Sequence, residues 1–295
     1  MPLPFVKMHG LGNDYVYVDG FTHDVPNPEQ LAPVIADRHF GVGGDGLILV
    51  LPPRHGTDAH CRMRMFNIDG SEGEMCGNGI RCVCKFAYDH QLFSGARDAN
   101  PMRIDTDNGV LSLEYQLGED GLIDTVRVDM GEPRIQLDQV PVDVQNASKA
   151  LNDHTVRIDA DGHALDAACV STGNPHAVIY ADDHPDANLW EQLHTIGPML
   201  EHHAAFPERA NIHFVKIRDA STVDVLHWER GSGATLACGT GASAVCVAGV
   251  LTGRTQRKLT AHLPGGPLDL EWDETTNHVF MTGPAREAFT GVWPG

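Results

Sequence analysis

The sequence predicts an α/β protein made of two similar domains, and three observations support this prediction. Two Cys-Gly-x-Gly segments, one at Cys76 and one at Cys238, lie far apart in the chain. A strand-like segment precedes each of them, and a helix-like segment with the same register of apolar residues follows each. Self-similarity of this kind indicates two copies of one supersecondary unit.

The strand before each cysteine shows the two-residue period of a β-strand, over 61–65 in the first copy and 223–227 in the second. Asn67 and Glu229 then occupy the same position relative to their cysteines. Further upstream, a Gly-Asn pair precedes an apolar strand in both copies, and its amide residues are Asn13 and Asn174. The repeat therefore extends well beyond the cysteine segments.

The helix after each cysteine has small or apolar residues at the i, i+3, i+4 and i+7 positions, which form one face of a helix. These residues are Ile80, Val83, Cys84 and Ala87 in the first copy, and Ala242, Val245, Cys246 and Gly249 in the second. A free cysteine packs as a small hydrophobe. We therefore expect Cys84 and Cys246 in the core.

The repeat also sets the expected domain boundaries. The first domain is expected over 1–130 together with about 280–295, which returns to it, and the second over 131–279. Near the end of the second domain, 259–263 and 268–272 read as the strands of a hairpin around Pro-Gly-Gly-Pro.

Composition excludes several classes of protein. The formal net charge of −19 disfavours nucleic acid and anionic membranes as partners. The chain has no apolar run of the roughly 18–20 residues that a membrane span needs, and its start does not read as a signal peptide. The odd count of 7 cysteines argues against a disulfide framework, and neither CxxC nor HExxH spacing predicts a metal site. We expect a cytoplasmic protein with reduced thiols.

The segment Gly41–Gly46 matches the GxGxxG pattern of dinucleotide-binding proteins. That fingerprint needs a strand before the glycines and a helix after them. Here a helix-like stretch, 29–39, comes first, and an apolar strand, 47–51, follows. The order is reversed, so we do not predict a nucleotide site.

A cysteine placed directly before a helix lies at the positive end of the helix dipole, next to unpaired backbone N–H groups, and both favour thiolate over thiol. The flanking glycines let the backbone approach an anion closely. Two such turns facing one carboxylate would place a sulfur on each side of the neighbouring carbon. This pattern predicts stereoinversion at an α-carbon, with Cys76 and Cys238 exchanging the proton.

Other interpretations of the cysteine pair remain. The two cysteines could be structural, or could form a disulfide in an oxidised state. A non-catalytic amino-acid-binding protein would use the N–H groups without the thiols. A redox switch would use the disulfide itself as the working state.

The chain is similar to diaminopimelate epimerases along nearly its whole length. The resemblance rests on motifs at Met8–Asp14, Phe66–Ser71, Met75–Cys82, Thr172–His176, Glu208–Phe214, Trp228–Gly231 and Ala237–Ala242. It implies two pseudo-symmetric domains, each a mixed or antiparallel sheet wrapped around a central helix. It also implies conversion of LL- to meso-2,6-diaminopimelate for lysine and peptidoglycan-precursor synthesis, with no pyridoxal phosphate and no metal.

The resemblance implies a role for each site residue. Cys76 and Cys238 are the acid–base pair, and His176 and Glu229 tune their pKa values. The substrate-binding residues are Asn13, Asn67, Gly77, Asn78, Asn174, Asn211, Glu229, Arg230, Gly239 and Thr240. Arg230 is expected at the distal carboxylate, since guanidinium binds carboxylate in a bidentate way. A homodimer with Phe289 at the contact is implied as well.

Two related families are rival interpretations. Proline and hydroxyproline epimerases typically have a histidine two residues after the first catalytic cysteine, where this chain has Asn78. The phenazine-pathway isomerase type shares the fold but lacks the cysteine pair. A charged group such as Arg230 also fits a substrate with a second charged end better than a cyclic one.

Overall fold

The computed structural model describes residues 2–73 and 76–294. The chain divides into two compact units. Unit 1 is Met1–Asp129 with Thr282–Gly295, and unit 2 is Met130–Met281. Glu74 and Met75, which belong to the first cysteine motif, lie outside the described residues.

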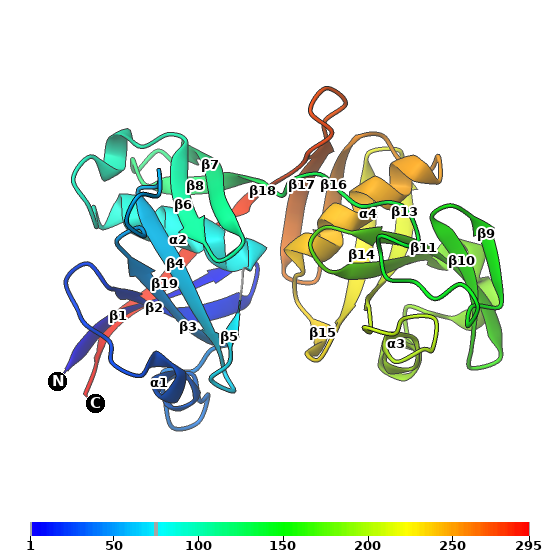
Figure 1. Ribbon diagram of the computed structural model, residues 1–295, viewed down its shortest axis with the longest axis horizontal. Coiled ribbons are helices and arrows are strands. Elements are labelled where there is room, and N and C mark those ends of the chain that lie inside the picture. Colours follow the sequence, from blue (N-terminus) through cyan, green and yellow to red (C-terminus); the bar gives the residue numbers. More distant parts are fainter. Residues whose placement is uncertain (1, 74–75, 295) are drawn as a thin grey trace. The chain divides into compact units, whose positions relative to one another are not determined.

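Unit 1 is built mostly of strands, with one long helix (Figure 1). Its strands are β1 (Leu3–Gly10), β2 (Asn13–Asp19), β3 (Gly46–Leu51), β4 (Cys61–Asn67), β5 (Glu72–Gly73), β6 (Met102–Thr106), β7 (Gly109–Leu117), β8 (Ile123–Asp129) and β19 (Arg286–Trp293). Its helices are α1 (Pro28–Ile35), α2 (Gly77–Asp89) and the short 3-10 helix η1 (Ala96–Asp98). Strand β18 (Val279–Pro284) carries the chain back from unit 2.

Unit 2 repeats this order of elements (Figure 1). Its strands are β9 (Lys149–Asn152), β10 (Thr155–Ala160), β11 (His163–Ser171), β12 (Pro175–Tyr180), β13 (Asn211–Asp219), β14 (Thr222–Glu229), β15 (Gly233–Thr235), β16 (Lys258–Leu263) and β17 (Gly266–Trp272). Its helices are α3 (Leu193–Glu201), α4 (Gly239–Leu251) and the 3-10 helices η2 (Ala181–Asp183) and η3 (Pro185–Ala187).

Strand pairing confirms the internal repeat. In unit 1, β1 pairs antiparallel with β2, β2 parallel with β3, and β3 antiparallel with β4. In unit 2, β11, β12, β13 and β14 follow the same sequence of antiparallel, parallel and antiparallel pairs. Strands β4 and β14 then each pair parallel with the strand that follows the long helix, β6 and β16. The mixed sheets predicted for the two domains are therefore present.

The long helices are buried on all sides, which goes beyond the single buried face that the sequence predicted. Every residue of α2 from Gly77 to Tyr88 is buried, as are Gly239 and 241–249 of α4. The predicted core positions, including Cys84 and Cys246, are fully buried. Since the sheet of each unit wraps around its helix, the polar side of α2 is enclosed as well.

Two local predictions are corrected by the structure. The helix expected over 29–39 ends at Ile35, because the Ile35 carbonyl accepts hydrogen bonds from Val42 and Gly43 N–H as the loop folds back. The glycine-rich segment after it leads into β3, so the order of helix, glycines and strand holds. The hairpin of β16 and β17 is present, but its turn is shorter than expected because Leu263 pairs directly with Gly266.

The C-terminal segment lies in unit 1, where β19 pairs antiparallel with β1. Leu3 pairs with Trp293 at one end of this ladder and His9 with Arg286 at the other. Within the described part of the chain, no helix has the length and apolar character needed to cross a membrane.

Candidate active-site residues in the two units

The two cysteines occupy equivalent backbone positions. Cys76 is the N-cap of α2 with φ −131° and ψ 118°, and Cys238 is the N-cap of α4 with φ −125° and ψ 108°. Each helix has 13 residues and begins at the glycine after its cysteine. The first N–H groups of a helix have no partner within it, and the helix dipole adds positive potential there. Each turn can therefore hold an anion beside its sulfur.

Cys76 is partly exposed, and its polar contacts include one with Asn13 and one with Gly79. Its thiol donates to Asn13 Oδ1 at 3.2 Å, and its sulfur accepts the Gly79 N–H at 3.3 Å. Asn13 begins β2, after Gly12 with a φ of 86°. The sequence-predicted residues Asn13 and Cys76, far apart in the chain, are thus in direct contact.

A charged network fixes the orientation of the Asn13 amide. Asn13 Nδ2 donates to Asp45 Oδ2 at 2.7 Å, which leaves Oδ1 facing the thiol. Arg38 bridges Asp45 and Asp14 at 2.9 and 2.7 Å, and Lys7 lies 2.6 Å from Asp14. Burial acts to raise the pKa of Asp14, but hydrogen bonds from Arg38 and Lys7 hold it below its usual value. Sequence reasoning missed this network, since its members converge only in the fold.

Arg81 is completely buried and lies in α2 one turn after Gly77. Its guanidinium donates to the Gly77 carbonyl at 3.2 Å, to Asn78 Oδ1 at 3.0 Å and to the Pro284 carbonyl at 3.2 Å. Burial lowers its pKa, while the nearby thiols of Cys82 and Cys76 act in the opposite direction. A cation thus supports the turn that carries Cys76.

Cys238 has a different environment, with only 4% of its surface exposed. Burial raises the pKa of its thiol well above the usual value, and the neighbouring Glu229 carboxylate raises it further. The Thr240 hydroxyl, 3.5 Å from the sulfur, and the Gly241 N–H act in the opposite direction. Glu229 ends β14, and its Oε1 accepts the Thr235 hydroxyl at 2.5 Å. Thus Cys238, Thr240 and Glu229, all predicted from the sequence, lie together.

The turn after Glu229 is held by a buried carboxylate that sequence reasoning missed. Glu201, at the end of α3, is 3% exposed. It accepts hydrogen bonds from Trp228 Nε1 at 2.8 Å and from the Gly231 N–H at 3.0 Å. No local sequence signal marks this carboxylate, since its partners lie on a later strand and turn.

Asn211 links two backbone segments. Its Nδ2 donates to the Pro175 carbonyl and its Oδ1 accepts the Arg230 N–H, each at 2.9 Å. The Arg230 side chain is exposed and donates to the Glu208 carbonyl at 3.0 Å. Asn211 therefore positions the backbone of Arg230, and its expected contact with the substrate stays a prediction.

His176 is completely buried and belongs to a row of three imidazoles. Its Nε2 lies 2.8 Å from Asn174 Oδ1, and its Nδ1 lies 2.8 Å from His213 Nε2. His213 Nδ1 in turn lies 2.7 Å from His227 Nδ1. Burial lowers the pKa of His176 and of His227 to about 3, and that of His213 well below its usual value. The three rings are therefore neutral near pH 7.

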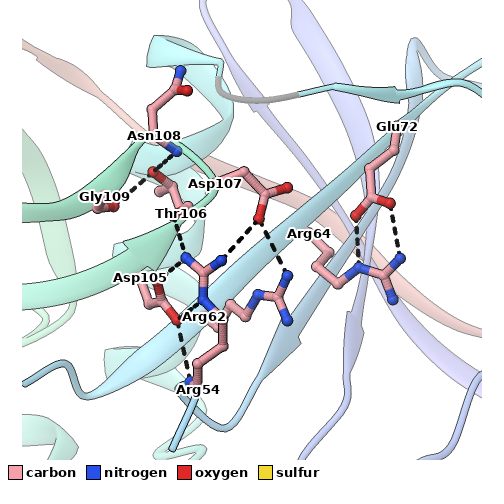
Figure 2. A network of polar contacts seen from close by, with 9 residues as sticks. All are labelled: Arg54, Arg62, Arg64, Glu72, Asp105, Thr106, Asp107, Asn108 and Gly109. Carbon is pink, nitrogen blue, oxygen red and sulfur yellow. Dashed lines mark hydrogen bonds and ion pairs between the residues drawn. The ribbon is translucent and has the colours of Figure 1, made fainter. Parts of the chain in front are cut away.

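Asn67 ends β4, and its Nδ2 donates to Ser71 Oγ at 3.0 Å. The hairpin that follows is fastened by Arg64, which lies 2.6 and 2.9 Å from the two carboxylate oxygens of Glu72. Figure 2 shows this ion pair beside a second group in which Arg54 and Arg62 contact aspartates. These arginines are neutralised by carboxylates, so they brace the strands leading to the Cys76 turn.

Phe289 lies on β19 with 49% of its surface exposed, and its ring meets that of Phe5 edge-on at 6.0 Å. All seven cysteines are free. Among the described residues, no group of three or more histidine, cysteine, aspartate or glutamate side chains is arranged to hold a metal ion.

Comparison with known proteins identifies the relatives of this arrangement. A family model described as diaminopimelate epimerase matches residues 5–136 and 168–287. The chain is 48% identical over 287 residues to a diaminopimelate epimerase of Acetivibrio thermocellus, with 97% of each chain covered. It is 46% identical over 291 residues to one of Methanococcus maripaludis, covering 98% of this chain and 99% of that one.

Solved structures of lower sequence identity share the fold. A probable proline racemase from Agrobacterium radiobacter has a TM-score of 0.68 at 14% identity and covers 98% of this chain and 92% of its own. A hydroxyproline epimerase from Agrobacterium vitis has a TM-score of 0.67 at 13% identity, with 99% and 92% covered. A PhzF-family protein from Bacillus anthracis has a TM-score of 0.65 at 15% identity, with 99% of each chain covered. At these identities the likeness to the rival families shows a shared fold and no more.

Proposed function

The chain belongs to the diaminopimelate epimerase family and is an isomerase, and we propose that it interconverts LL- and meso-2,6-diaminopimelate with Cys76 and Cys238 as the two proton-transfer groups. The observation that carries this proposal is the matched placement of the two thiols. Each is the N-cap of a long buried helix and so lies beside the N–H groups of that helix's first turn, which can bind the carboxylate of an amino acid.

The reaction needs one base and one acid. The thiolate of one cysteine removes the α-proton, and the electron pair moves into the adjoining carboxylate. The thiol of the other cysteine then protonates the α-carbon from the opposite side, and its sulfur becomes the new thiolate. The charge on the carboxylate is stabilised by the N–H groups of Gly77 and Asn78 and of Gly239 and Thr240, and one such donor is worth about 3–4 kcal/mol in other enzymes.

The remaining site residues support this reaction in our proposal. Glu229 keeps Cys238 protonated as the thiol, in line with the raised pKa of that group. Arg230 binds the distal carboxylate, and its exposed guanidinium leaves room for that contact. The other amide residues, Asn13, Asn67 and Asn174, recognise the amino groups and the ends of the substrate, and His176 tunes the acid–base pair.

We propose that the protein works in the cytoplasm, in lysine and peptidoglycan-precursor synthesis. Seven free thiols, two of them needed for the reaction, fit a reducing compartment. We further propose a homodimer that includes Phe289, whose half-exposed ring lies on the outer strand of the β1–β19 pair.

Solvent exchange tests the proposal directly. The purified, reduced protein is incubated in D2O with LL-diaminopimelate and no added cofactor. We expect deuterium at the α-position together with formation of the meso isomer. Ligand binding without exchange would support an amino-acid-binding protein instead, and activity that survives oxidation of the cysteines to a disulfide would support a redox switch. Either result would refute the two-thiol mechanism.

A further inference from the structure

The row of buried histidines under the second cysteine turn has a fixed direction of hydrogen bonding. His176 Nε2 faces Asn174 Oδ1, a carbonyl oxygen that only accepts, so this nitrogen carries the proton. A neutral imidazole has one N–H, so His176 Nδ1 is the acceptor and His213 Nε2 donates to it. By the same argument His213 Nδ1 accepts from His227 Nδ1–H.

The far end of the row supports the same direction independently. With its proton on Nδ1, His227 has a bare lone pair on Nε2. This atom is buried and has no hydrogen-bond partner among the described residues. The opposite direction would leave an unpaired N–H at this point, and buried N–H groups without partners are rarer than buried acceptors without partners. Both ends of the row therefore select one set of tautomers.

The row also lies directly beneath the turn of Cys238. A side-chain carbon at Gly241 would come within 2.3 Å of His213 Cε1, so the first turn of α4 rests on this ring. His213 is completely buried and belongs to β13, and His227 is completely buried on the neighbouring β14. The imidazoles are thus held between the sheet and the catalytic helix.

From this geometry we infer that His213 and His227 are positioning residues for the proton-transfer site: they fix the tautomer of His176 and, through it, the orientation of the Asn174 amide. With Oδ1 bound to His176, the Nδ2 group of Asn174 is directed away from the ring and is available to a ligand. This inference rests on the proposed function, because it assigns His213 and His227 to the same site.

The tautomers are measured by NMR of the 15N-labelled full-length protein at neutral pH, through the imidazole nitrogen shifts. We expect the proton on Nε2 of His176, on Nε2 of His213 and on Nδ1 of His227. The reversed set, or a doubly protonated ring at neutral pH, would overturn the inference. This measurement needs no substrate, so it stands apart from the test of the epimerase activity.

Variants then test whether the row acts on the site. His213→Leu removes the donor to His176, whereas His213→Gln can place an amide N–H close to the same point. We expect kcat/KM for α-proton exchange to fall about a hundredfold in the leucine variant, as small displacements of reacting groups can cost. The glutamine variant should recover most of the loss, and the His176 tautomer should be mixed only in the leucine variant.

A second pair of variants covers the case in which His213→Leu does not fold. His227→Leu should lower kcat/KM and His227→Asn should restore part of it, because an amide N–H can replace Nδ1–H. His184→Gln is the matched control, since its ring contacts the Asp166 N–H outside the row. Wild-type kcat/KM in a folded leucine variant would overturn the inference. A wild-type protein with the expected tautomers but no exchange would instead refute the proposed function.

Discussion

The two cysteine turns share a backbone but differ in the charge placed around it. Arg81 in α2 and Ser243 in α4 are equivalent, since each donates to the carbonyl of the helix's first glycine, at 3.2 and 3.0 Å. Asn67 and Glu229 are equivalent as the last residues of β4 and β14. The first turn thus combines a buried cation with an amide, and the second combines a hydroxyl with a carboxylate.

If the two cysteines transfer protons as we propose, this difference lets one repeated fold hold two groups for opposite tasks. The repeat supplies the same N-cap and the same helix terminus to both sulfurs. The Glu229 carboxylate raises the pKa of the Cys238 thiol, whereas the buried cation Arg81 supports the turn of Cys76. The support behind each site amide also differs, because Asn13 is held by exposed ion pairs and Asn174 by neutral, buried imidazoles.

Removing either thiol should have the largest effect on activity, and it tests whether the two cysteine turns form a catalytic pair. We expect Cys76→Ala and Cys238→Ala each to lower epimerisation by about 10²–10⁴-fold, the usual contribution of a positioned acid or base. Activity is measured by conversion of LL- to meso-diaminopimelate. Cys169→Ala, a buried cysteine on β11, should keep nearly full activity. If one of the two N-cap cysteines proves dispensable, the turns are not a catalytic pair.

Lowering the pH should decrease the folding stability of unit 2 before that of unit 1. Burial lowers the pKa of His176 and His227 to about 3, whereas the unfolded chain takes up these protons below about pH 6.5. Stability is therefore complete above about pH 6.5 and falls as the pH drops toward 3, by roughly 1.4 kcal/mol per pH unit for each histidine. In unit 1 the pKa of Asp14 lies below its usual value, so the stabilisation from that carboxylate begins to be lost only as the pH falls below about 4.

Urea unfolding followed by tryptophan fluorescence measures this effect, because Trp190, Trp228 and Trp272 lie in unit 2. The urea concentration at the unfolding midpoint should be lower at pH 5 than at pH 7. The decrease should be smaller in His227→Leu and unchanged in His202→Gln, which replaces an exposed ring. A midpoint that is the same at both pH values would show that the buried rings are protonated in the folded state.

Arg230 has no counterpart in unit 1, where Ile68 follows Asn67. If Arg230 binds the distal carboxylate, Arg230→Ala should lower kcat/KM about 10–100-fold, because a hydrogen bond to a charged group contributes about 1.5–3 kcal/mol. Arg218→Ala is the control, since that exposed residue pairs with Asp224 on the same hairpin. A matching loss of thermal stability in Arg230→Ala would remove it from the site.

Glu229→Gln should have the smallest effect on activity among these variants, and its effect should be confined to the Cys238 thiol. Without the carboxylate, the pKa of the Cys238 thiol should decrease, so Cys238 should be alkylated faster near neutral pH. We expect kcat to fall about tenfold, or roughly 1.4 kcal/mol. Peptide mapping after brief iodoacetamide treatment follows each thiol. An equal change in the alkylation rate of Cys76 would mean that Glu229 does not act specifically on the second turn. Glu191→Gln provides the surface control.

The sequence predicted the parts of the fold that depend on local patterns. The two cysteine helices, the alternating strands and the β16–β17 hairpin follow from periodicity and turn residues, and the motifs identified the family. The contact of Cys76 with Asn13, and that of Cys238 with Glu229, agree with residues singled out from these motifs.

The residues that support the site were not predicted, for a physical reason. Glu201, Asp45, His213 and His227 act through partners that are distant in the sequence, so no periodic pattern identifies them. The histidine row has a further difficulty, because a histidine in an alternating strand such as β14 reads as an ordinary inward-facing residue. Only the position of its ring nitrogens distinguishes a hydrogen-bonded row from simple packing.

The pairing of β19 with β1 sets the order in which the two units can complete their folding during synthesis. The ribosome produces unit 2 as one continuous stretch, whereas unit 1 needs its last strand from the C-terminal end of the chain. Until that strand emerges, β1 is paired on one side only, and an unpaired strand edge readily associates with other chains. The unit that is translated first is therefore the last to be completed, and truncation at the C-terminus would damage the N-terminal half of the molecule.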